Sequence, residues 1–328
     1  MKVIITGATG FLGRNLAESL HDDGVDVVAT GRTRSVGDEL SGQGMAFLPA
    51  DILDAEGLEG VFASGDCVVH CAGRYGDWGS YDDFHRDNVV GTRNVVRACD
   101  RHGIRKLIFI STPSMYYDGK DRLDIAESEP LPEQTMCYGK TKRIAELELL
   151  ALRERGYRVI ILRPRAVYGP HDNTIVPRIL RMAKKRRMPM VNHGRALVDI
   201  TYVGNFVDVV RASLNAGDEA WNEVYNVSNG DPMRVRDWFQ QVLDIFDRPF
   251  RPLNVPEPAA RAVAMGMEWA SRLPFGPKEP SLTRFSVGYM AKSMTMSIAK
   301  AKEKLGWSPR VGNREGFERY ADWVAKRH

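Results

Sequence analysis

The sequence predicts an α/β fold, a doubly wound parallel sheet with a smaller C-terminal lobe, on three observations. Short apolar runs alternate with amphipathic segments through the first half of the chain. A glycine-rich turn, "TGATGFLG" at 6–13, follows the first apolar run and opens the first amphipathic segment. After Pro164 the alternation loosens and the strand candidates become short. Continuous apolar strands that alternate with helices are typical of a parallel sheet covered on both faces.

Each expected strand of this sheet is a short apolar run between segments of helical periodicity. The runs lie at 2–6, 26–30, 46–50, 67–72, 106–111 and 158–164. The main helices between them are expected at 86–102 and 138–155. Later helices are expected near 176–187, 203–215, 234–246 and 259–272, and later strands at 197–201 and 223–227.

We expect two lobes, because a chain of 328 residues is long for a single core. The sheet should occupy residues 1–168, with returning segments at about 197–215 and 223–228. Residues 169–328 should mainly form a substrate-binding lobe over the C-terminal edge of the sheet, where ligands bind in open α/β folds.

The composition is typical of a soluble globular chain, with 43% hydrophobic and 27% charged residues. The net charge of +4 is mild and spread out, so it does not indicate a nucleic-acid partner. The four cysteines form no CxxC pair, and we expect neither a metal site nor a disulfide framework. No apolar run reaches the roughly 18 residues of a membrane span, and no signal peptide precedes the first strand. We therefore expect a cytoplasmic protein with no integral membrane segment.

The glycine-rich turn has the spacing GxxGxxG, with Gly7, Gly10 and Gly13 between a strand and a helix. Gly7 permits a tight turn, Gly10 lets backbone N–H groups approach a pyrophosphate, and Gly13 allows close packing of helix and strand. The start of the helix adds free donors and a positive dipole end. This is the Rossmann-type arrangement, and it predicts a dinucleotide site.

The end of the second strand favours NADP(H) over NAD(H). In "VVATGRTRS", Gly31 stands where an acidic residue would hold the 2′-hydroxyl of NAD, and Arg32 and Arg34 follow. Guanidinium groups suit a 2′-phosphate. NAD(H) remains the alternative if Arg32 is solvated or stacks on the adenine. Asp51, at the end of the third strand, is expected either to meet the adenine amino group or to cap a helix.

Several motifs together resemble the extended short-chain dehydrogenase/reductase (NAD-dependent epimerase/dehydratase) superfamily. They are "TGATGFLG", "HCAG" (70–73), "NVVGTRNV" (88–95), "FIST" (109–112), "YGKTK" (138–142), "LRPRAVYGP" (162–170) and "KLGWSPRV" (304–311). The segments "STPSMYYDG" (111–119) and "VDITYVGN" (198–205) are similar to the branch of 3β-hydroxysteroid dehydrogenases and 2-alkyl-3-oxoalkanoate reductases.

The resemblance implies a catalytic triad of Thr112, Tyr138 and Lys142, with Asn88 in a proton relay. The dinucleotide contacts that it implies are Gly7, Thr9, Gly10, Phe11, Leu12, Gly13, Arg32, Arg34, Asp51, Ile52, Cys71, Ala72, Gly73, Asn88, Ser111, Tyr138, Lys142, Pro164 and Val167. It also implies a homodimer formed through the helices at 86–102 and 138–155.

The pair in "MCYGKTK" suits proton transfer to a ketone. Residues i and i+4 share one helix face, so Lys142 can lie beneath Tyr138 and lower the pKa of its phenol. Thr112 would position the substrate oxygen at the end of its strand. The same side chains could instead be an ordinary strand end and two surface residues, but the phosphate loop upstream favours catalysis.

Three functions remain open, and an alcohol–ketone oxidoreductase is favoured. The second is a nucleotide-sugar epimerase or dehydratase with tightly bound NAD, and the third is a non-catalytic dinucleotide-sensing regulator. Epimerases commonly have an arginine where this chain has Val198, and dehydratases have Asp-Glu where it has Pro113-Ser114. An intact triad argues against the regulator.

The substrate is expected to be lipophilic. The expected substrate contacts are Tyr75, Trp78, Thr112, Ser114 and Tyr138. The segment 258–275 is rich in methionine and other apolar residues. For the individual methionines we favour ordinary core packing, with a peripheral membrane contact of the segment as the alternative.

Overall fold

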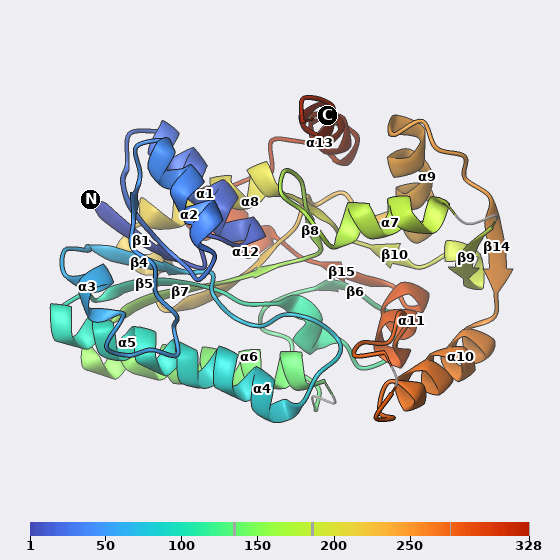
Figure 1. Cartoon of the computed structure of the whole chain (residues 1–328), viewed down its shortest axis with the longest axis horizontal. Helices are drawn as coiled ribbons and strands as arrows, with labels where there is room; N and C mark the ends of the chain where they lie inside the picture. Colours follow the sequence, from blue (N-terminus) through green and yellow to red (C-terminus); the bar gives the residue numbers. More distant parts are fainter. Residues whose placement is uncertain (134–135, 185–186, 276, 328) are drawn as a thin grey trace.

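The computed structural model of the chain describes residues 1–133, 136–184, 187–275 and 277–327. Its central sheet has the strand order β12-β7-β5-β4-β1-β2-β3, and every neighbouring pair is parallel (Figure 1). This confirms the predicted fold class. The strands are β1 (Lys2–Thr6), β2 (Asp26–Thr30), β3 (Ala46–Phe47), β4 (Cys67–His70), β5 (Lys106–Ile110), β7 (Arg158–Pro164) and β12 (Glu223–Val227).

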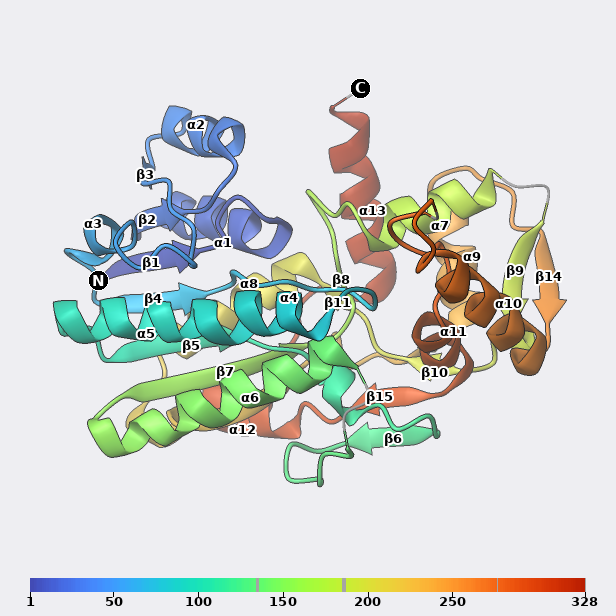
Figure 2. The ribbon, with the colours of Figure 1, turned by 60° about the horizontal axis from the view of Figure 1, so that its bottom comes forward.

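Helices cover both faces of the sheet, as the continuous apolar strands predict. One face carries α1 (Phe11–Asp22), α8 (Val203–Leu214) and α12 (Ala299–Leu305). The other carries α3 (Glu59–Phe62), α5 (Gly91–His102) and α6 (Cys137–Ala151), seen in front of the sheet in Figure 2. Helix α2 (Arg34–Gly42) connects β2 to β3.

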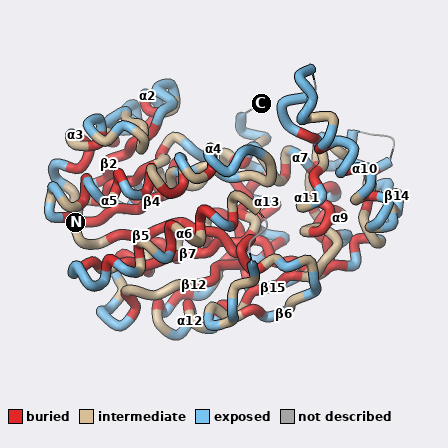
Figure 3. The backbone as a smooth tube through the Cα atoms, turned by 90° about the horizontal axis from the view of Figure 1, so that it is seen from below, coloured by how far each residue is buried: buried red, intermediate tan, exposed pale blue. Residues whose placement is uncertain are grey.

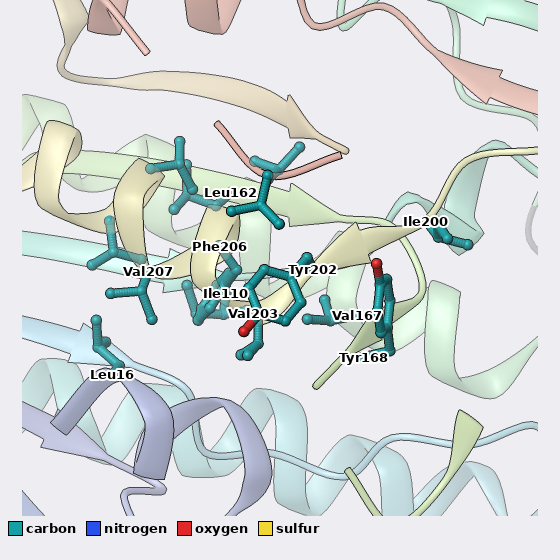
Figure 4. Packing of buried hydrophobic residues seen from close by; sticks show 14 of the residues in the cluster. Leu16, Ile110, Leu162, Val167, Tyr168, Ile200, Tyr202, Val203, Phe206 and Val207 are labelled. Carbon is teal, nitrogen blue, oxygen red and sulfur yellow. The ribbon is translucent and has the colours of Figure 1, made fainter. Parts of the chain in front are cut away.

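Each strand supplies both hydrophobic cores, because successive side chains point to opposite faces. In β1, Val3 and Ile5 belong to one core and Ile4 to the other, and all three are fully buried. Figure 3 shows this burial along the sheet strands. On the α8 face, Phe206 packs near Ile110 and other buried side chains of the same cluster (Figure 4). The sheet is therefore the rigid base of the molecule.

The second lobe contains small sheets and further helices. Its sheets have the orders β13-β10-β15-β6, β11-β8 and β14-β9. The strands are β6 (Arg122–Ile125), β8 (Val167–Tyr168), β9 (Met188–Val191), β10 (Leu197–Val198), β11 (Thr201–Tyr202), β13 (Met233–Arg234), β14 (Pro252–Val255) and β15 (Met294–Met296). The helices are α7 (Ile175–Ala183), α9 (Val235–Ile245), α10 (Glu257–Ala270), α11 (Arg284–Ala291) and α13 (Asn313–Ala325).

Several predicted elements differ from the observed ones, and residues 185–186 of the helix expected near 176–187 lie outside the described residues. The strand expected at 197–201 is two strands, β10 and β11, which pair in different sheets. The strand expected at 46–50 ends at Phe47. The helix expected at 86–102 begins earlier, with α4 (Tyr81–His85), and continues through a π-helical turn at Arg86–Val90. Such π-turns occur frequently at functional sites.

Candidate active site

The carboxyl ends of β1, β4 and β5 lie side by side, because these strands are parallel neighbours. The register aligns Thr6 with His70, and His70 with Phe109. The turns that follow the strands therefore converge at one edge of the sheet, beside the second lobe (Figure 1). This is the edge where open α/β folds bind ligands.

The turn after β1 is shaped by its glycines. Gly7 has φ +72°, and a Cβ there would stand 2.7 Å from the backbone nitrogen of Ala72. A Cβ on Gly13 would overlap the Gly7 carbonyl. Gly10 caps α1 without a side chain, and the first turn of α1 has no acidic residue, so its N–H groups are free for an anion. The turn therefore fits a dinucleotide pyrophosphate.

Replacing Gly13 with alanine should abolish dinucleotide binding and destabilise the fold. The new methyl group would meet backbone atoms of Gly7 and Ala8, which cannot move aside as a flexible side chain can. The matched control is Gly266→Ala in α10, where no atom lies within 4 Å of the added Cβ. That control should be more stable by about 0.5–1 kcal/mol. Dinucleotide titration and thermal melting of both variants test this, and unchanged binding by Gly13→Ala would contradict the close approach.

The expected 2′-phosphate site holds two exposed arginines and one carboxylate. Thr9 packs against Gly31, because its hydroxyl would contact a Cβ at that position. Arg34 is the first residue of α2. Arg32 lies 3.7 Å from Asp51 in an ion pair at the surface. Asp51 also accepts a hydrogen bond of 3.0 Å from the Leu53 backbone.

The structure brings Thr112, Tyr138 and Lys142 to the end of β5. Thr112 begins the 3₁₀ turn Pro113–Tyr116, and its hydroxyl accepts a hydrogen bond of 3.2 Å from the Ser114 backbone. The Thr112 side chain lies close enough to the Tyr138 phenol to lower the pKa of that phenol. The Lys142 ammonium donates a hydrogen bond of 2.8 Å to the Ile110 carbonyl. The predicted triad thus surrounds one point at the sheet edge.

Burial dominates the electrostatics of this group. It raises the pKa of Tyr138 to about 12, against the influence of Thr112, which lowers it. Burial lowers the pKa of Lys142 to about 8. The Lys142 ammonium also lies 4.2 Å from the centre of the Phe109 ring, a cation–π contact. The pKa of Tyr138 is therefore raised rather than lowered as expected, because desolvation of the phenol dominates it.

Asn88 lies in the π-helical turn and is 1% exposed. Its amide nitrogen donates to the Arg74 carbonyl at 3.0 Å and to the Thr141 hydroxyl at 3.1 Å. Its amide oxygen accepts from the Arg74 backbone at 2.8 Å. A Cβ on Gly73 would meet that oxygen at 2.7 Å. The Asn88 side chain therefore ties the turn after β4 to the helix that carries Tyr138 and Lys142.

His70 is a site residue to which the sequence analysis assigned no role. Its Nε2 lies 3.0 Å from the Thr92 hydroxyl, which itself donates to the Asn88 carbonyl at 2.7 Å. The Thr92 oxygen must then accept from Nε2–H, and Nδ1 accepts from the Thr6 hydroxyl at 2.7 Å. Burial lowers the pKa of His70 to about 3, so the ring is neutral. The signal available in the sequence was a polar residue at the last position of an otherwise apolar strand.

The remaining predicted dinucleotide residues follow the same edge. Ser111 is buried, and its hydroxyl has no hydrogen-bond partner among the described residues, so it can accept a ligand contact. Its backbone donates to the Leu162 carbonyl at 2.7 Å. The others are half-buried (Phe11, Leu12, Ile52, Cys71, Ala72) or buried (Pro164, Val167). An orphan hydroxyl at the same edge of the sheet as the glycine turn supports a cofactor site along this edge.

The two expected aromatic substrate contacts differ. Tyr75 is 64% exposed, and its phenol acts electrostatically on Tyr138. Trp78 donates its indole N–H to the Lys278 carbonyl at 3.2 Å, and the Arg272 guanidinium lies 5.9 Å from its ring. Trp78 therefore connects the loop after β4 to the second lobe, whereas Tyr75 stands nearer to the triad.

The methionines of α10 are exposed, so the expectation of ordinary core packing was wrong. Its buried residues are Ala260, Ala264 and Glu268, one helical turn apart. The exposed large apolar residues here are Val263, Met265, Met267, Trp269, Leu273 and Phe275. The small alanines occupy the contact face of the helix and leave the larger apolar side chains outside.

No helix in the described ranges has the length and apolarity that a membrane crossing requires. Within the same ranges, no group of three or more His, Cys, Asp or Glu side chains could hold a metal ion. The four cysteines are free thiols; Cys67 and Cys99 are buried, and Cys71 and Cys137 are half-buried.

A sequence profile described as the NAD dependent epimerase/dehydratase family matches residues 3–228, more than half of the chain. The chain belongs to this family. The prediction of an extended short-chain dehydrogenase/reductase enzyme is thereby confirmed. The glycine turn and the orphan hydroxyl of Ser111 fit the nicotinamide dinucleotide in the family name.

Two curated members of the family align over nearly the whole chain. A 2-alkyl-3-oxoalkanoate reductase of Stenotrophomonas maltophilia is 32% identical, over 97% of this chain and 98% of its own. A decarboxylating sterol-4-alpha-carboxylate 3-dehydrogenase of Saccharomyces cerevisiae is 29% identical, over 98% and 97%. Among solved structures, a UDP-glucose 4-epimerase of Thermotoga maritima has a TM-score of 0.80 and 24% identity, over 100% and 99%. That last likeness shows the fold alone.

Proposed function

We propose that the protein is an NAD(P)-dependent oxidoreductase that interconverts a secondary alcohol and a ketone on a lipophilic substrate. The observation that carries this proposal is the convergence of Thr112 and Tyr138 beside the buried Lys142, at the edge that also carries the phosphate turn. The substrate class is of the 3β-hydroxysteroid, sterol or 2-alkyl-3-oxoalkanoate type. The names of the two curated relatives support it.

The residues of the triad have separate roles in ketone reduction. A bound nicotinamide dinucleotide would supply the hydride, and the glycine turn and the Ser111 hydroxyl would help to hold it. Thr112 and Tyr138 hold the substrate oxygen, and Tyr138 donates its proton to that oxygen as negative charge develops there. Lys142 then stabilises the resulting phenolate. Asn88 positions the helix and the turn that hold these groups and supports proton return.

The nucleotide-sugar epimerase or dehydratase is the weaker alternative. Val198, which stands in place of the expected arginine, is buried in β10 and cannot bind a diphosphate. Pro113 and Ser114, which stand in place of the Asp-Glu pair, form a buried 3₁₀ turn. Neither position supplies the charged group that these reactions need. The third function, a non-catalytic dinucleotide-sensing regulator, also lacks support, because the residues of the predicted catalytic triad are all present.

A panel of ketones and alcohols, assayed with NADPH, NADH and their oxidised forms, tests the proposal. We expect net change of the reduced-cofactor absorbance with long-chain ketones or alcohols. Purified protein that retains NAD and shows no net redox turnover with any compound would contradict the proposal and favour an epimerase.

We further propose that NADP(H) is preferred, with NAD(H) as the weaker cofactor. Arg32 and Arg34 stand at the start of α2, where a 2′-phosphate would meet two guanidinium groups and a helix N-terminus. Arg32→Ala should weaken NADPH relative to NADH by about 10- to 100-fold in kcat/KM, the value of one charged hydrogen bond. Arg314→Ala, which removes an equally exposed arginine from α13, is the matched control. An unchanged cofactor ratio in Arg32→Ala would contradict the assignment.

Several further parts of the sequence prediction remain proposals. Residues 1–168 bind the dinucleotide and 169–328 mainly the substrate, in a cytoplasmic homodimer formed through α5 and α6. These helices lie side by side on the outer face (Figure 2), and Leu147 there is 61% exposed. Sedimentation at the mass of one 36.8 kDa chain would contradict the dimer.

The exposed apolar side of α10 is the proposed peripheral membrane contact, and failure to bind lipid vesicles would contradict it.

A further inference from the structure

Arg165 is a fully buried cation that forms no ion pair within the described residues. It is the bulkiest side chain among those that the fold buries completely, and it is 1% exposed. Its Nε and Nη1 atoms make no hydrogen bond with any described residue. Asp199 acts on it only as a more distant charge, while the Asp199 carboxylate itself accepts a 2.5 Å hydrogen bond from the Met296 backbone. Buried charges are normally paired and hydrogen-bonded, so an arginine in this state indicates a missing anion.

The fold places Arg165 beside the triad. Ile110 pairs with Leu162 in the register of β5 and β7, and the Ser111 backbone still donates to the Leu162 carbonyl, so the segments that follow these two strands leave the sheet edge side by side. Thr112 lies in the first segment and Arg165 in the second. The ring that Arg165 faces, Tyr289, also contacts Tyr117, which directly follows the 3₁₀ turn that Thr112 begins. Arg165 therefore belongs to the same edge of the sheet as the triad.

The backbone around Arg165 is fixed in an unusual conformation. Its N–H donates to the Val227 carbonyl at 2.9 Å, and its carbonyl accepts from the Thr201 hydroxyl at 2.6 Å. The next residue, Ala166, has φ +43°, which residues other than glycine rarely adopt. Strained positions of this kind cluster at ligand sites, where the surrounding structure holds them. The position of the guanidinium is thus set by the fold rather than by an internal ion pair.

An apolar surface lies directly against this cation. The Arg165 guanidinium stands 3.7 Å from the centre of the Tyr289 ring. Tyr289 stacks on Phe285 at 5.0 Å, and Tyr117 meets both rings edge-on at 5.9 and 5.1 Å. We call Tyr117, Phe285 and Tyr289 the aromatic cluster; all three are half-buried. A cation against such a cluster suits an amphiphile with an anionic head and an apolar body.

We propose that Arg165 determines specificity by binding the carboxylate of a 3-oxo or 3-hydroxy carboxylic acid, with the alkyl part against the aromatic cluster. The proposal rests on the alcohol–ketone chemistry proposed above. In such an acid the carboxylate carbon is two bonds from the reacting carbon, so one site must hold both groups. A planar carboxylate fits the guanidinium plane. The names of both curated relatives describe substrates with a carboxylate near a 3-oxygen function.

The test compares 3-hydroxydodecanoate with its methyl ester as substrates for oxidation with NADP⁺ and NAD⁺. The wild-type chain should prefer the acid by at least about 100-fold in kcat/KM, because the ester leaves the buried guanidinium unpaired. Arg165→Met should lose most of that preference, because its kcat/KM for the acid falls. Its kcat/KM for the ester should stay within a few-fold of the wild-type value. Arg165→Lys should keep part of the preference, because it keeps the charge.

The control is Arg122→Met. Arg122 is half-buried and, like Arg165, lies near an aromatic ring, 6.0 Å from the centre of Tyr116. Unlike Arg165, it is ion-paired, with Glu129. The acid-to-ester ratio should stay unchanged in this variant. Equal turnover of acid and ester by the wild-type chain would overturn the role of Arg165 and leave the proposed function intact. An equal loss of kcat/KM for the acid and the ester in Arg165→Met would also overturn the role of Arg165, because it indicates a structural role. Thermal melting would then show that the variant is destabilised. Absence of turnover with these compounds and with the whole ketone and alcohol panel would overturn both proposals together.

Discussion

Replacing Tyr138 with phenylalanine is expected to lower kcat by about 10²- to 10⁴-fold, the usual contribution of a general acid. Burial raises the pKa of the Tyr138 phenol to about 12, so it remains protonated through the neutral range. Phenylalanine keeps the ring near Phe84, whose centre lies 6.1 Å away, and removes only the proton donor. Steady-state kinetics with the best ketone of the panel measure the effect.

Dinucleotide affinity separates loss of chemistry from loss of structure in this variant. The phosphate turn and Lys142 are untouched, so binding should remain within a few-fold of the wild-type value. The matched control is Tyr225→Phe in β12, which removes a buried phenol that donates only to the Ala220 carbonyl. Its kcat should be unchanged. A Tyr138→Phe variant with full kcat and normal cofactor binding would show that the proton comes from another group.

The central sheet was predictable because its signals are local. The runs "KVIIT" and "RVIILRP" are apolar on both faces, and β1 and β7 end where these runs end. The second lobe was less predictable, since β6 and β15 are short and depend on pairing with segments more than 100 residues away. No run of apolar residues marks such strands. The π-turn at Arg86–Val90 depends on buried tertiary contacts of Asn88, which sequence periodicity does not report.

In the site as well, motifs predict the positions of the residues, whereas the surrounding packing determines their properties. The positions of Thr112, Tyr138 and Lys142 followed from their motifs and from the order of the strands. The pKa of Tyr138 did not, because it depends on how much protein covers the phenol. Arg165 lies in the motif "LRPRAVYGP", but the motif does not indicate its role, because the lack of hydrogen-bond partners at its guanidinium is visible only when the packing is known.

Replacing Glu146 with glutamine is expected to destabilise the fold by about 3–5 kcal/mol, because it leaves a buried charge unpaired. The Glu146 and Arg163 side chains are 3% and 5% exposed and join α6 to β7. The two hydrogen bonds between them measure 3.0 and 2.5 Å, and Arg163 also donates to the Tyr116 hydroxyl. Glu146 lies one turn after Lys142, so the pair also holds the helix that carries the triad. Chemical denaturation of the variant measures the loss.

The same helix supplies the matched control two residues further on. Glu148 forms a similarly short two-bond pair with Arg93, but these side chains are 38% and 48% exposed. Because solvent screens that pair, Glu148→Gln should cost only about 0.2–1 kcal/mol. The double variant Glu146→Leu with Arg163→Met removes both buried charges and should recover much of the stability lost in Glu146→Gln. If Glu146→Gln and Glu148→Gln prove equally stable, the buried pair does not hold α6 against β7. The geometry of Tyr138 and Lys142 would then depend on Asn88 and the helix backbone alone.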